Sequence, residues 1–198
     1  MSLIYAGGWV MIPLLLISVI VLALIIDRSL TLIWNPMPDK TQREKIFEAV
    51  RSGNNAQAAE ILRETDWLKS YANALQSEKK AALYEGYLTE AVTDIAAFLE
   101  RRCALLATLG RVSPLLGLLG TIIGMIQTFA VVAQSRSGID MELLADGIWQ
   151  ALITTATGLI IAIPAILCYR VFLSIEAERL DFFNRLSNTA ILLKESQD

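Results

Sequence analysis

Hydrophobic residues gather in three long runs along this 198-residue chain, instead of recurring with the spacing of a half-buried helix or strand. The runs cover residues 9–26, about 112–133 and about 147–169, and none of them contains a charged side chain. About 20 consecutive apolar residues are enough for a helix to cross the hydrocarbon core of a bilayer. The pattern therefore predicts an all-α membrane protein with three transmembrane helices.

The polar stretch after the first run predicts a helical region outside the membrane. Pro36 and Pro38 end the first helix there, because proline lacks a backbone donor and disfavours helix in the residue before it. Further on, apolar residues recur at i, i+4, i+7 and i+11 in Leu88, Val92, Ile95 and Leu99. No glycine or proline occurs between residues 87 and 109, so this helix is expected to run unbroken into the second span.

The stretch after the third run keeps an apolar period as well. It is carried by Leu173, Ile175, Leu180, Phe183, Leu186 and Ile191. Two of the spans are therefore predicted to extend into a cytoplasmic helical bundle. The expected organisation is an N-terminal periplasmic end and first span over 1–34, a cytoplasmic helical region over 35–102, a second span over 103–134, a short periplasmic loop over 135–146, a third span over 147–169 and a cytoplasmic C-terminal helix over 170–198.

Lysine and arginine are distributed unevenly between the polar stretches, and basic residues are retained on the cytoplasmic side of a membrane. They concentrate between the first two spans and after the third: Lys40, Arg43, Lys45, Arg51, Arg63, Lys69, Lys79, Lys80, Arg101, Arg102, Arg170, Arg179, Arg185 and Lys194. The first eight residues carry none, which also argues against a cleaved signal peptide. We expect a retained first span, a periplasmic N-terminus and a cytoplasmic C-terminus.

The remaining composition excludes several classes of function. Charged residues make up 19% of the chain and the net charge is −3, so nucleic acid is not an expected partner. There is no histidine, and the two cysteines lie near the ends of apolar runs, which argues against a disulfide framework or a metal site. No His-Glu-x-x-His motif, serine–base pairing or phosphate loop is present. We therefore expect neither enzyme chemistry nor a cofactor.

Small and hydroxyl residues form a stripe on each of the last two spans. The first stripe is Gly117, Thr121, Gly124 and Thr128, with Gly120 beside it; the second is Ala151, Thr155, Gly158 and Ala162, flanked by Thr154 and Thr157. Small residues let helices approach closely in lipid, so the stripes can serve helix packing alone. A hydroxyl can also donate and accept hydrogen bonds at once, so the threonines can line a hydrated path. Both interpretations stay open.

Acidic residues are missing from both of these spans. No Asp or Glu occurs between Glu100 and Asp140, or between Asp146 and Glu176. Proton relays in membranes use Asp, Glu or His as the titrating group. If protons move along the threonines, a partner must therefore supply the acid, and otherwise nothing moves.

Four further residues have a predicted role at the spans. Arg111 is expected to anchor the second span at the membrane interface, with an ion pair to Glu100 of a neighbouring copy as the alternative. Gln150 either bonds between helices or lines a pore. Pro164 is expected to bend the third span.

The two spans resemble the signature segments of the MotA/TolQ/ExbB proton-channel family. The resemblance is carried by residues 106–125 and 147–165, in which Pro, Gly, Thr and Ala stand at matching offsets. Residues 7–13, Gly-Gly-Trp-Val-Met-Ile-Pro, are similar to the start of ExbB-type members. A weaker stretch, about 36–84, separates these segments.

The resemblance implies a homopentamer in the bacterial inner membrane that encloses the single spans of two copies of an ExbD- or TolR-like partner. That partner carries an aspartate, and proton flow past it drives work on a TonB- or TolA-like protein for outer-membrane transport or envelope integrity. Thr121 and Thr155 would face this aspartate. Several ExbB-type members have glutamate where this chain has Gln150, so a titrating role there is in doubt.

Three other functions compete with a proton-driven subunit. The chain can be a non-conducting scaffold whose threonines only pack helices, a passive pore that conducts without a partner, or a MotA-like flagellar stator subunit. The sequence does not choose between a Ton and a Tol system.

Overall fold

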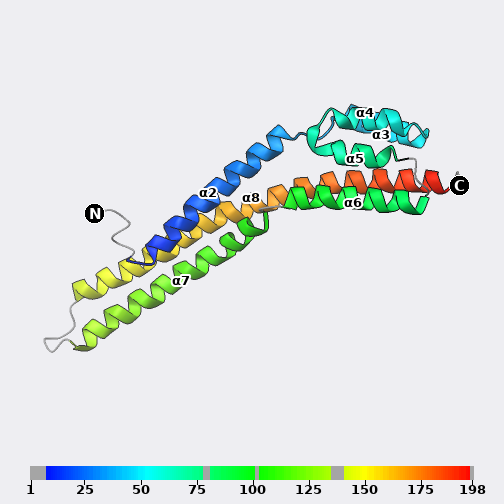
Figure 1. The fold of residues 1–198 in the computed structure, drawn as a ribbon. Coiled ribbons are helices and arrows are strands. Elements are labelled where there is room, and N and C mark those ends of the chain that lie inside the picture. Colours follow the sequence, from blue (N-terminus) through cyan, green and yellow to red (C-terminus); the bar gives the residue numbers. More distant parts are fainter. Residues whose placement is uncertain (1–7, 78–80, 101–102, 135–140, 197–198) are drawn as a thin grey trace. The chain divides into compact units, whose positions relative to one another are not determined.

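The computed structural model describes residues 8–77, 81–100, 103–134 and 141–196. These residues form helices and no strand: α2 (Met11–Trp34), α3 (Lys40–Arg51), α4 (Asn55–Arg63), the short 3-10 helix η1 (Asp66–Leu68), α5 (Lys69–Leu75), α6 (Ala81–Glu100), α7 (Cys103–Gln134) and α8 (Met141–Glu195) (Figure 1). Three stretches are long and apolar enough to cross a membrane, namely α2, a stretch that ends with α7, and α8. The all-α fold with three transmembrane helices is thereby confirmed.

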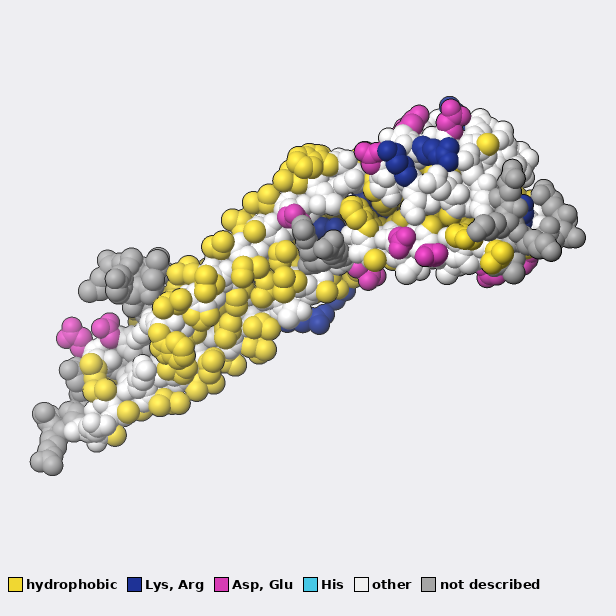
Figure 2. Space-filling view, in the orientation of Figure 1, with side chains coloured by type: hydrophobic (Ala, Val, Ile, Leu, Met, Phe, Trp, Pro, Cys, Tyr) yellow, Lys and Arg dark blue, Asp and Glu magenta, His cyan; other side chains and the backbone are white. Residues whose placement is uncertain are grey.

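The chain divides into two compact units. The transmembrane unit consists of Met1–Arg28 and Arg102–Val171, and the bundle unit consists of Ser29–Arg101 and Phe172–Asp198. Helix α8 contributes its first part to one unit and its last part to the other. Hydrophobic side chains dominate the visible surface of α2 and α7, while charged side chains gather mostly on the bundle unit (Figure 2).

In the transmembrane unit, α7 lies antiparallel to the first part of α8. Gly110 of α7 lies beside Ala165 of α8, and towards the other end Gly124 lies beside Ala151. Helix α2 buries Met11, Leu14 and Val21, whereas most of its other apolar side chains are exposed. Exposed apolar residues along this helix suit contact with lipid.

The bundle unit has a core of large side chains. Tyr71 of α5, Tyr84 of α6 and Phe183 of α8 are fully buried at its centre. The rings of Tyr71 and Phe183 pack edge to face with centroids 4.9 Å apart. The Tyr71 hydroxyl also lies 2.8 Å from the Ser187 hydroxyl, so α5 is joined to α8 by both apolar and polar contacts.

Capping and turn residues explain where the helices of the bundle unit begin and end. After α2 ends at Trp34, Asp39 caps α3 with its side chain, and the Asp39 backbone N–H donates to the Gln42 Oε1 atom at 3.0 Å. Between α3 and α4 the chain turns at Gly53, whose φ of 75° lies in the left-handed region that glycine adopts without strain. The predicted break near Pro36 is confirmed.

Several details differ from the sequence predictions. Helix α8 begins at Met141, so the expected loop over 135–146 is helical from that residue on. The inner face of the last part of α8 includes Phe172 and Phe182, whereas Leu173 and Ile175, predicted as inner, are exposed. The predicted continuity of the helix through residues 101 and 102 lies outside the described residues.

The sequence analysis did not predict η1 and α5. Their inward residues Leu68, Tyr71, Ala72 and Leu75 are all fully buried. They stand at i, i+3, i+4 and i+7, which is the spacing of an amphipathic helix. This spacing is visible in the sequence, but it extends over only about two helical turns.

Candidate functional site

The contact between α7 and α8 is made by backbone, because glycines face it from both helices. A Cβ placed on Gly117 would lie 2.8 Å from the Thr154 carbonyl oxygen and 3.0 Å from the Thr155 Cα. A Cβ placed on Gly158 would lie 2.6 Å from the Ser113 carbonyl oxygen. Any larger residue at these two positions would force the helices apart.

The same close approach continues towards the end of α7. Gly120 leaves space for the Thr154 side chain, whose Cβ would be 2.8 Å from an added methyl group. Gly147 of α8 leaves similar space for Thr128 of α7, whose Cβ and Cγ2 would also lie 2.8 Å from such a group. Gly117, Gly120, Gly124, Thr128 and Gly158 therefore all lie in the contact between α7 and α8, and their packing function stays a prediction.

Two threonine hydroxyls converge on one backbone carbonyl across this contact. The Thr155 hydroxyl of α8 donates to the Gly117 carbonyl oxygen at 3.2 Å. The Thr154 hydroxyl lies 3.3 Å from the same oxygen and 2.7 Å from the Ala151 carbonyl oxygen of its own helix. Because a hydroxyl has only one proton, Thr154 donates to one of these carbonyls at a time.

The threonines of α7 donate within their own helix. The Thr121 hydroxyl donates to the Leu118 carbonyl oxygen at 2.7 Å, and the Thr128 hydroxyl donates to the Gly124 carbonyl oxygen at 2.8 Å. Such back-bonding is the usual way for a hydroxyl to be satisfied on a helix in an apolar medium.

The threonines of α7 and α8 differ in the exposure of their side chains. Thr128 is 7% exposed and Thr154 is 1% exposed, so both belong to the contact itself. Thr121 and Thr155 are half-buried and lie at its edge. On α7 the buried face therefore includes Gly120 rather than Thr121, and on α8 it includes Thr154 rather than Thr155. In each helix the buried residue precedes the residue of the predicted stripe by one position.

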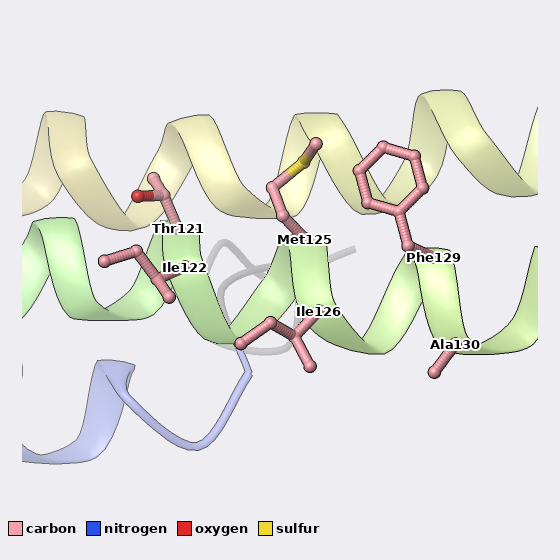
Figure 3. A pocket seen from close by; sticks show the side chains of 6 residues that line it. All are labelled: Thr121, Ile122, Met125, Ile126, Phe129 and Ala130. Atoms are coloured by element: carbon pink, nitrogen blue, oxygen red, sulfur yellow. The ribbon is translucent and has the colours of Figure 1, made fainter.

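Thr121 also begins a groove on the outer side of α7. Six residues line it: Thr121, Ile122, Met125, Ile126, Phe129 and Ala130. Thr121, Met125 and Phe129 point to one side of the helix, and the other three point to the opposite side (Figure 3). Thr121 supplies the only hydroxyl among these six lining residues, so the groove is otherwise apolar.

The other predicted site residues are spread around the transmembrane unit and its boundary. Gln150 is half-buried, and its Nε2 atom would lie 2.7 Å from a Cβ placed on Gly8, so the Gln150 side chain packs against Gly8. Arg111 and Glu100 are both exposed. Pro164 lies inside α8, which continues as helix past it, and the predicted bend remains a prediction.

Comparison with known proteins shows which family this chain belongs to. Residues 57–184, which include all of α6 and α7 and most of α8, match the MotA/TolQ/ExbB proton channel family. The chain belongs to this family. Its hydroxyl-bearing helix pair and its exposed groove therefore lie inside the matched region of a proton-channel-family protein.

Individual relatives agree with the family match. An ExbB-like biopolymer transport protein from Synechocystis is 34% identical over 184 residues, which cover 89% of this chain and 72% of that protein. The biopolymer transport protein exbB1 of Vibrio cholerae is 52% identical over 62 residues, 31% of this chain and 27% of its own. The Tol-Pal system protein TolQ of Haemophilus influenzae is 38% identical over 96 residues, 48% of this chain and 42% of its own.

The MotA/TolQ/ExbB match and these relatives make the chain a multi-pass bacterial membrane protein with a role in biopolymer transport. Two of these relatives are named as biopolymer transport proteins. Among the described residues, no group of three or more Cys, Asp or Glu side chains is arranged to hold a metal ion.

Three buried charged residues were missed by the sequence analysis, namely Arg28 of α2 and two residues of the bundle unit. Glu176 is 1% exposed and Arg179 is 8% exposed, and both lie on the bundle part of α8. The Arg179 guanidinium carbon lies 5.6 Å from the centre of the Trp67 ring, which is the geometry of a cation–π contact. Glutamate and arginine are rarely fully buried, so nothing in the sequence alone marks these two positions as inner ones.

Proposed function

We propose that this chain is the ExbB/TolQ-like subunit of a proton-driven motor in the bacterial inner membrane. In this proposal an ExbD- or TolR-like protein with one span supplies the titrating aspartate. The motor passes the resulting work to a TonB- or TolA-like protein that acts on the outer membrane. The observation that carries the proposal is the pair of reachable hydroxyls, Thr121 and Thr155, on two spans whose sequences contain no acid.

The two hydroxyls are close to the same point of the helix pair. Thr155 donates to the Gly117 carbonyl oxygen, and Thr121 is one helical turn after Gly117. Both side chains are half-buried, in contrast to Thr154 and Thr128, which are covered by this chain itself. A carboxyl group brought by another helix can therefore reach Thr121 and Thr155 but not the covered pair. Thr154 was predicted to belong to the proton pathway. In this proposal its buried hydroxyl instead bonds to the Gly117 carbonyl oxygen and helps to hold the two helices together.

An acid from elsewhere is needed because the spans carry no charged group. Residues 112–134 and 147–169 contain no Asp, Glu, Lys or Arg. Threonine hydroxyls do not gain or lose a proton near neutral pH, so they can orient a proton carrier but cannot replace it. This favours a complex over a chain that conducts alone.

The exposed groove on α7 also favours a complex. Most of its lining is apolar, and Ile122, Ile126 and Phe129 are about half exposed or more. In the proposed assembly, neighbouring copies and the partner span cover this surface. A homopentamer around two partner helices, with the remaining outer surface in lipid, is the arrangement that the family resemblance implies.

The proposed orientation follows from the basic residues. The described lysines and arginines lie mostly in the bundle unit, at positions between the first two spans and after the third. The rule that such residues remain in the cytoplasm places the N-terminus in the periplasm and the C-terminus in the cytoplasm. Arg111, exposed near the beginning of the second span, would anchor that helix at the cytoplasmic interface.

The test is proton flux in liposomes that contain this chain and its partner. Thr121→Ala and Thr155→Ala should each remove most of the flux, with complex assembly unchanged. Thr157→Ala is the matched control, because the Thr157 hydroxyl donates to the Ile153 carbonyl oxygen of its own helix at 2.8 Å. Full flux in both test variants would contradict the proposal.

A non-conducting scaffold is the second candidate. It is favoured by Thr128 and Thr154, whose hydroxyls are buried and bond only to backbone carbonyls of this chain among the described residues. A scaffold predicts that substitutions at Thr121 and Thr155 leave flux and energised transport unchanged, whereas Thr154→Val disturbs assembly. The same set of variants therefore separates the two functions.

A further inference from the structure

A short linker joins the end of α2 to α3 within the bundle unit. It runs from Asn35 to Asp39 and contains Pro36 and Pro38, whose rings fix their own φ angles and restrict the residue before each of them. Pro38 is buried, and Met37 packs against the hydrophobic core of the bundle unit. The linker is therefore stiff and lies against the bundle.

Both ends of the linker are bonded to the helices that they adjoin. At its beginning, the Asn35 side-chain amide donates to the Thr31 carbonyl oxygen of α2 at 2.9 Å. At its end, the Lys40 backbone N–H donates to the Asp39 side chain at 2.8 Å, and the Asp39 backbone N–H donates to Gln42. Such bonds supply partners that backbone groups at helix ends otherwise lack. They hold the linker to its two neighbours in the sequence.

Arg43 of α3 connects the linker to a further helix, α8. Its Nε atom donates to the Pro38 carbonyl oxygen at 2.8 Å, and its Nη1 atom donates to the Glu178 Oε1 atom of α8 at 3.1 Å. The planar guanidinium presents its donors in fixed directions, so one side chain can hold both acceptors at once. These two bonds, which we call the Arg43 bridge, join the two sequence segments that make up the bundle unit.

An aromatic contact one helical turn further along holds the same two helices in register. Phe47 lies one turn after Arg43 on α3, and Phe182 lies one turn after Glu178 on α8, so the two contacts share one face of each helix. The rings of Phe47 and Phe182 pack edge to face with centroids 5.3 Å apart. The aromatic contact docks α3 on α8, and the Arg43 bridge extends this docking to the linker.

The two bonds of the Arg43 bridge differ in strength. The side chain of Arg43 is 28% exposed and that of Glu178 is 72% exposed, and an ion pair this exposed is weak and is screened by salt. The bond from the guanidinium to the Pro38 carbonyl oxygen is charge-assisted and therefore stronger than a bond between neutral groups. Arg43 can thus release α8 while the aromatic core of the bundle stays packed.

We propose that the Arg43 bridge makes the linker after the first span a rigid but releasable joint with α8, the helix that continues the third span. With the bridge formed, a displacement of the end of α2 is passed through the linker to α8. With the bridge broken, the linker moves independently of α8. The inference concerns this joint and goes beyond the proposed function, because it holds whether or not the chain takes part in proton flux.

Hydrogen–deuterium exchange of the purified protein measures the joint directly. The readout is the exchange rate of the backbone amides in residues 37–44, which cover the linker and the first turn of α3. Arg43→Met removes both bonds of the bridge, and Glu178→Met removes the ion pair alone. Asp181→Asn is the matched control on α8, because it breaks another exposed ion pair, the one with Arg185 in the same helix.

Arg43→Met should raise the exchange rate of residues 37–44 about tenfold, since it removes a charge-assisted hydrogen bond as well as the ion pair. Glu178→Met should raise it about two- to fivefold, the range for an exposed ion pair. The Asp181→Asn control should leave it unchanged. Peptides around the buried residues Tyr71 and Phe183 should exchange as slowly in every variant as in the original protein, because the core stays packed.

Reversing the charges tests the ion pair without a change in overall charge. Arg43→Glu and Glu178→Arg should each raise the exchange rate, and the double variant should exchange more slowly than Arg43→Glu alone, because the pair is restored. The double variant should not reach the original rate, since glutamate cannot donate to the Pro38 carbonyl oxygen. Raising the salt concentration to about 1 M should speed exchange in the original protein and leave Glu178→Met unchanged.

Two results would overturn the inference. One is an exchange rate of residues 37–44 that is the same in the original protein, Arg43→Met and Glu178→Met. The other is a double charge-reversal variant that exchanges as fast as Arg43→Glu alone. This second comparison also decides the matter if Arg43→Met speeds exchange throughout the bundle unit, because general loosening of the fold would not be reversed by restoring one ion pair.

Discussion

The two parts of α8 show two different ways of holding helices together. In the transmembrane unit, its covered positions include Ala151, Thr154, Gly158, Ala162 and Ala165. In the bundle unit, the covered positions include large residues, namely Phe172, Phe182, Phe183 and Leu186. One continuous helix therefore changes from contacts between backbones to contacts between large side chains along its length.

The difference follows from the surroundings of each part. In water, burial of large apolar side chains drives association, so the bundle gains stability from side-chain area. In lipid that driving force is absent, and close backbone contact and hydrogen bonds replace it. Close contact also has a chemical result, because it brings the Thr155 hydroxyl to the Gly117 carbonyl oxygen. Packing and the proposed proton site are thus made by the same residues only in the transmembrane unit.

The largest effect should come from the aromatic core of the bundle. Phe183 is fully buried and packs against Tyr71, Phe182 and Trp67. Phe183→Ala should destabilise the bundle unit by about 3–5 kcal/mol, because it removes a large apolar side chain and leaves a cavity. Chemical denaturation followed by circular dichroism of the detergent-solubilised protein measures this. Leu173→Ala, at an exposed position of the same helix, should cost much less, and an equal cost for both would contradict the described core.

An intermediate effect is expected from added volume at the contact between α7 and α8. Gly158→Ala should weaken the contact by about 1–3 kcal/mol, because the added methyl group meets the Ser113 carbonyl oxygen at 2.6 Å. Gly86→Ala is the matched control, since a Cβ there meets nothing within 4 Å and alanine favours helix. Thermal stability of the purified protein should fall for the first variant and stay level or rise for the second. The reverse order would show that the helices do not approach as described.

The smallest effect is a pH dependence confined to the bundle unit. Burial raises the pKa of Tyr84 to about 12, and burial likewise holds the pKa of Tyr71 well above its ordinary value. A raised pKa in the folded state means that stability is complete below about pH 10, where unfolded tyrosine is neutral, and is lost as the pH rises towards 12.

Tyr84→Phe provides the control for this pH dependence. It removes one ionising group together with the hydrogen bond to the Leu75 carbonyl oxygen at 3.1 Å. The variant should be less stable at neutral pH and should lose less stability above pH 10 than the original protein. Denaturation curves at several alkaline pH values measure both. An unchanged slope against pH would mean that Tyr84 ionises as easily in the folded bundle as in water.

The sequence predicts the spans well because each depends on a long run of residues. A charge-free stretch of about 20 apolar residues has few alternatives to a transmembrane helix. The absence of acids between residues 100 and 140 is also a direct property of the sequence and needs no structure. Together they predict that, if protons move through these spans, a partner must supply the titrating group.

The exact covered face was harder to predict, because helical spacing of three and four residues leaves a choice between neighbours. Gly120 or Thr121 can continue a stripe from Gly117 to Gly124, and Thr154 or Thr155 can follow Ala151. The packing of α7 against α8 decides which neighbour is covered, and here Gly120 and Thr154 are the covered ones. The consequence is functional, since the threonines left at the edge are the ones that another helix can reach.

The central claim is that this chain supplies hydroxyls and its partner supplies the acid. Proton flux into liposomes tests it most directly when three samples are compared: this chain alone, this chain with its partner, and this chain with a partner whose transmembrane aspartate is replaced by asparagine. The account predicts a driven flux in the second sample only. An equal flux from this chain alone, or from the complex with the asparagine partner, would contradict it.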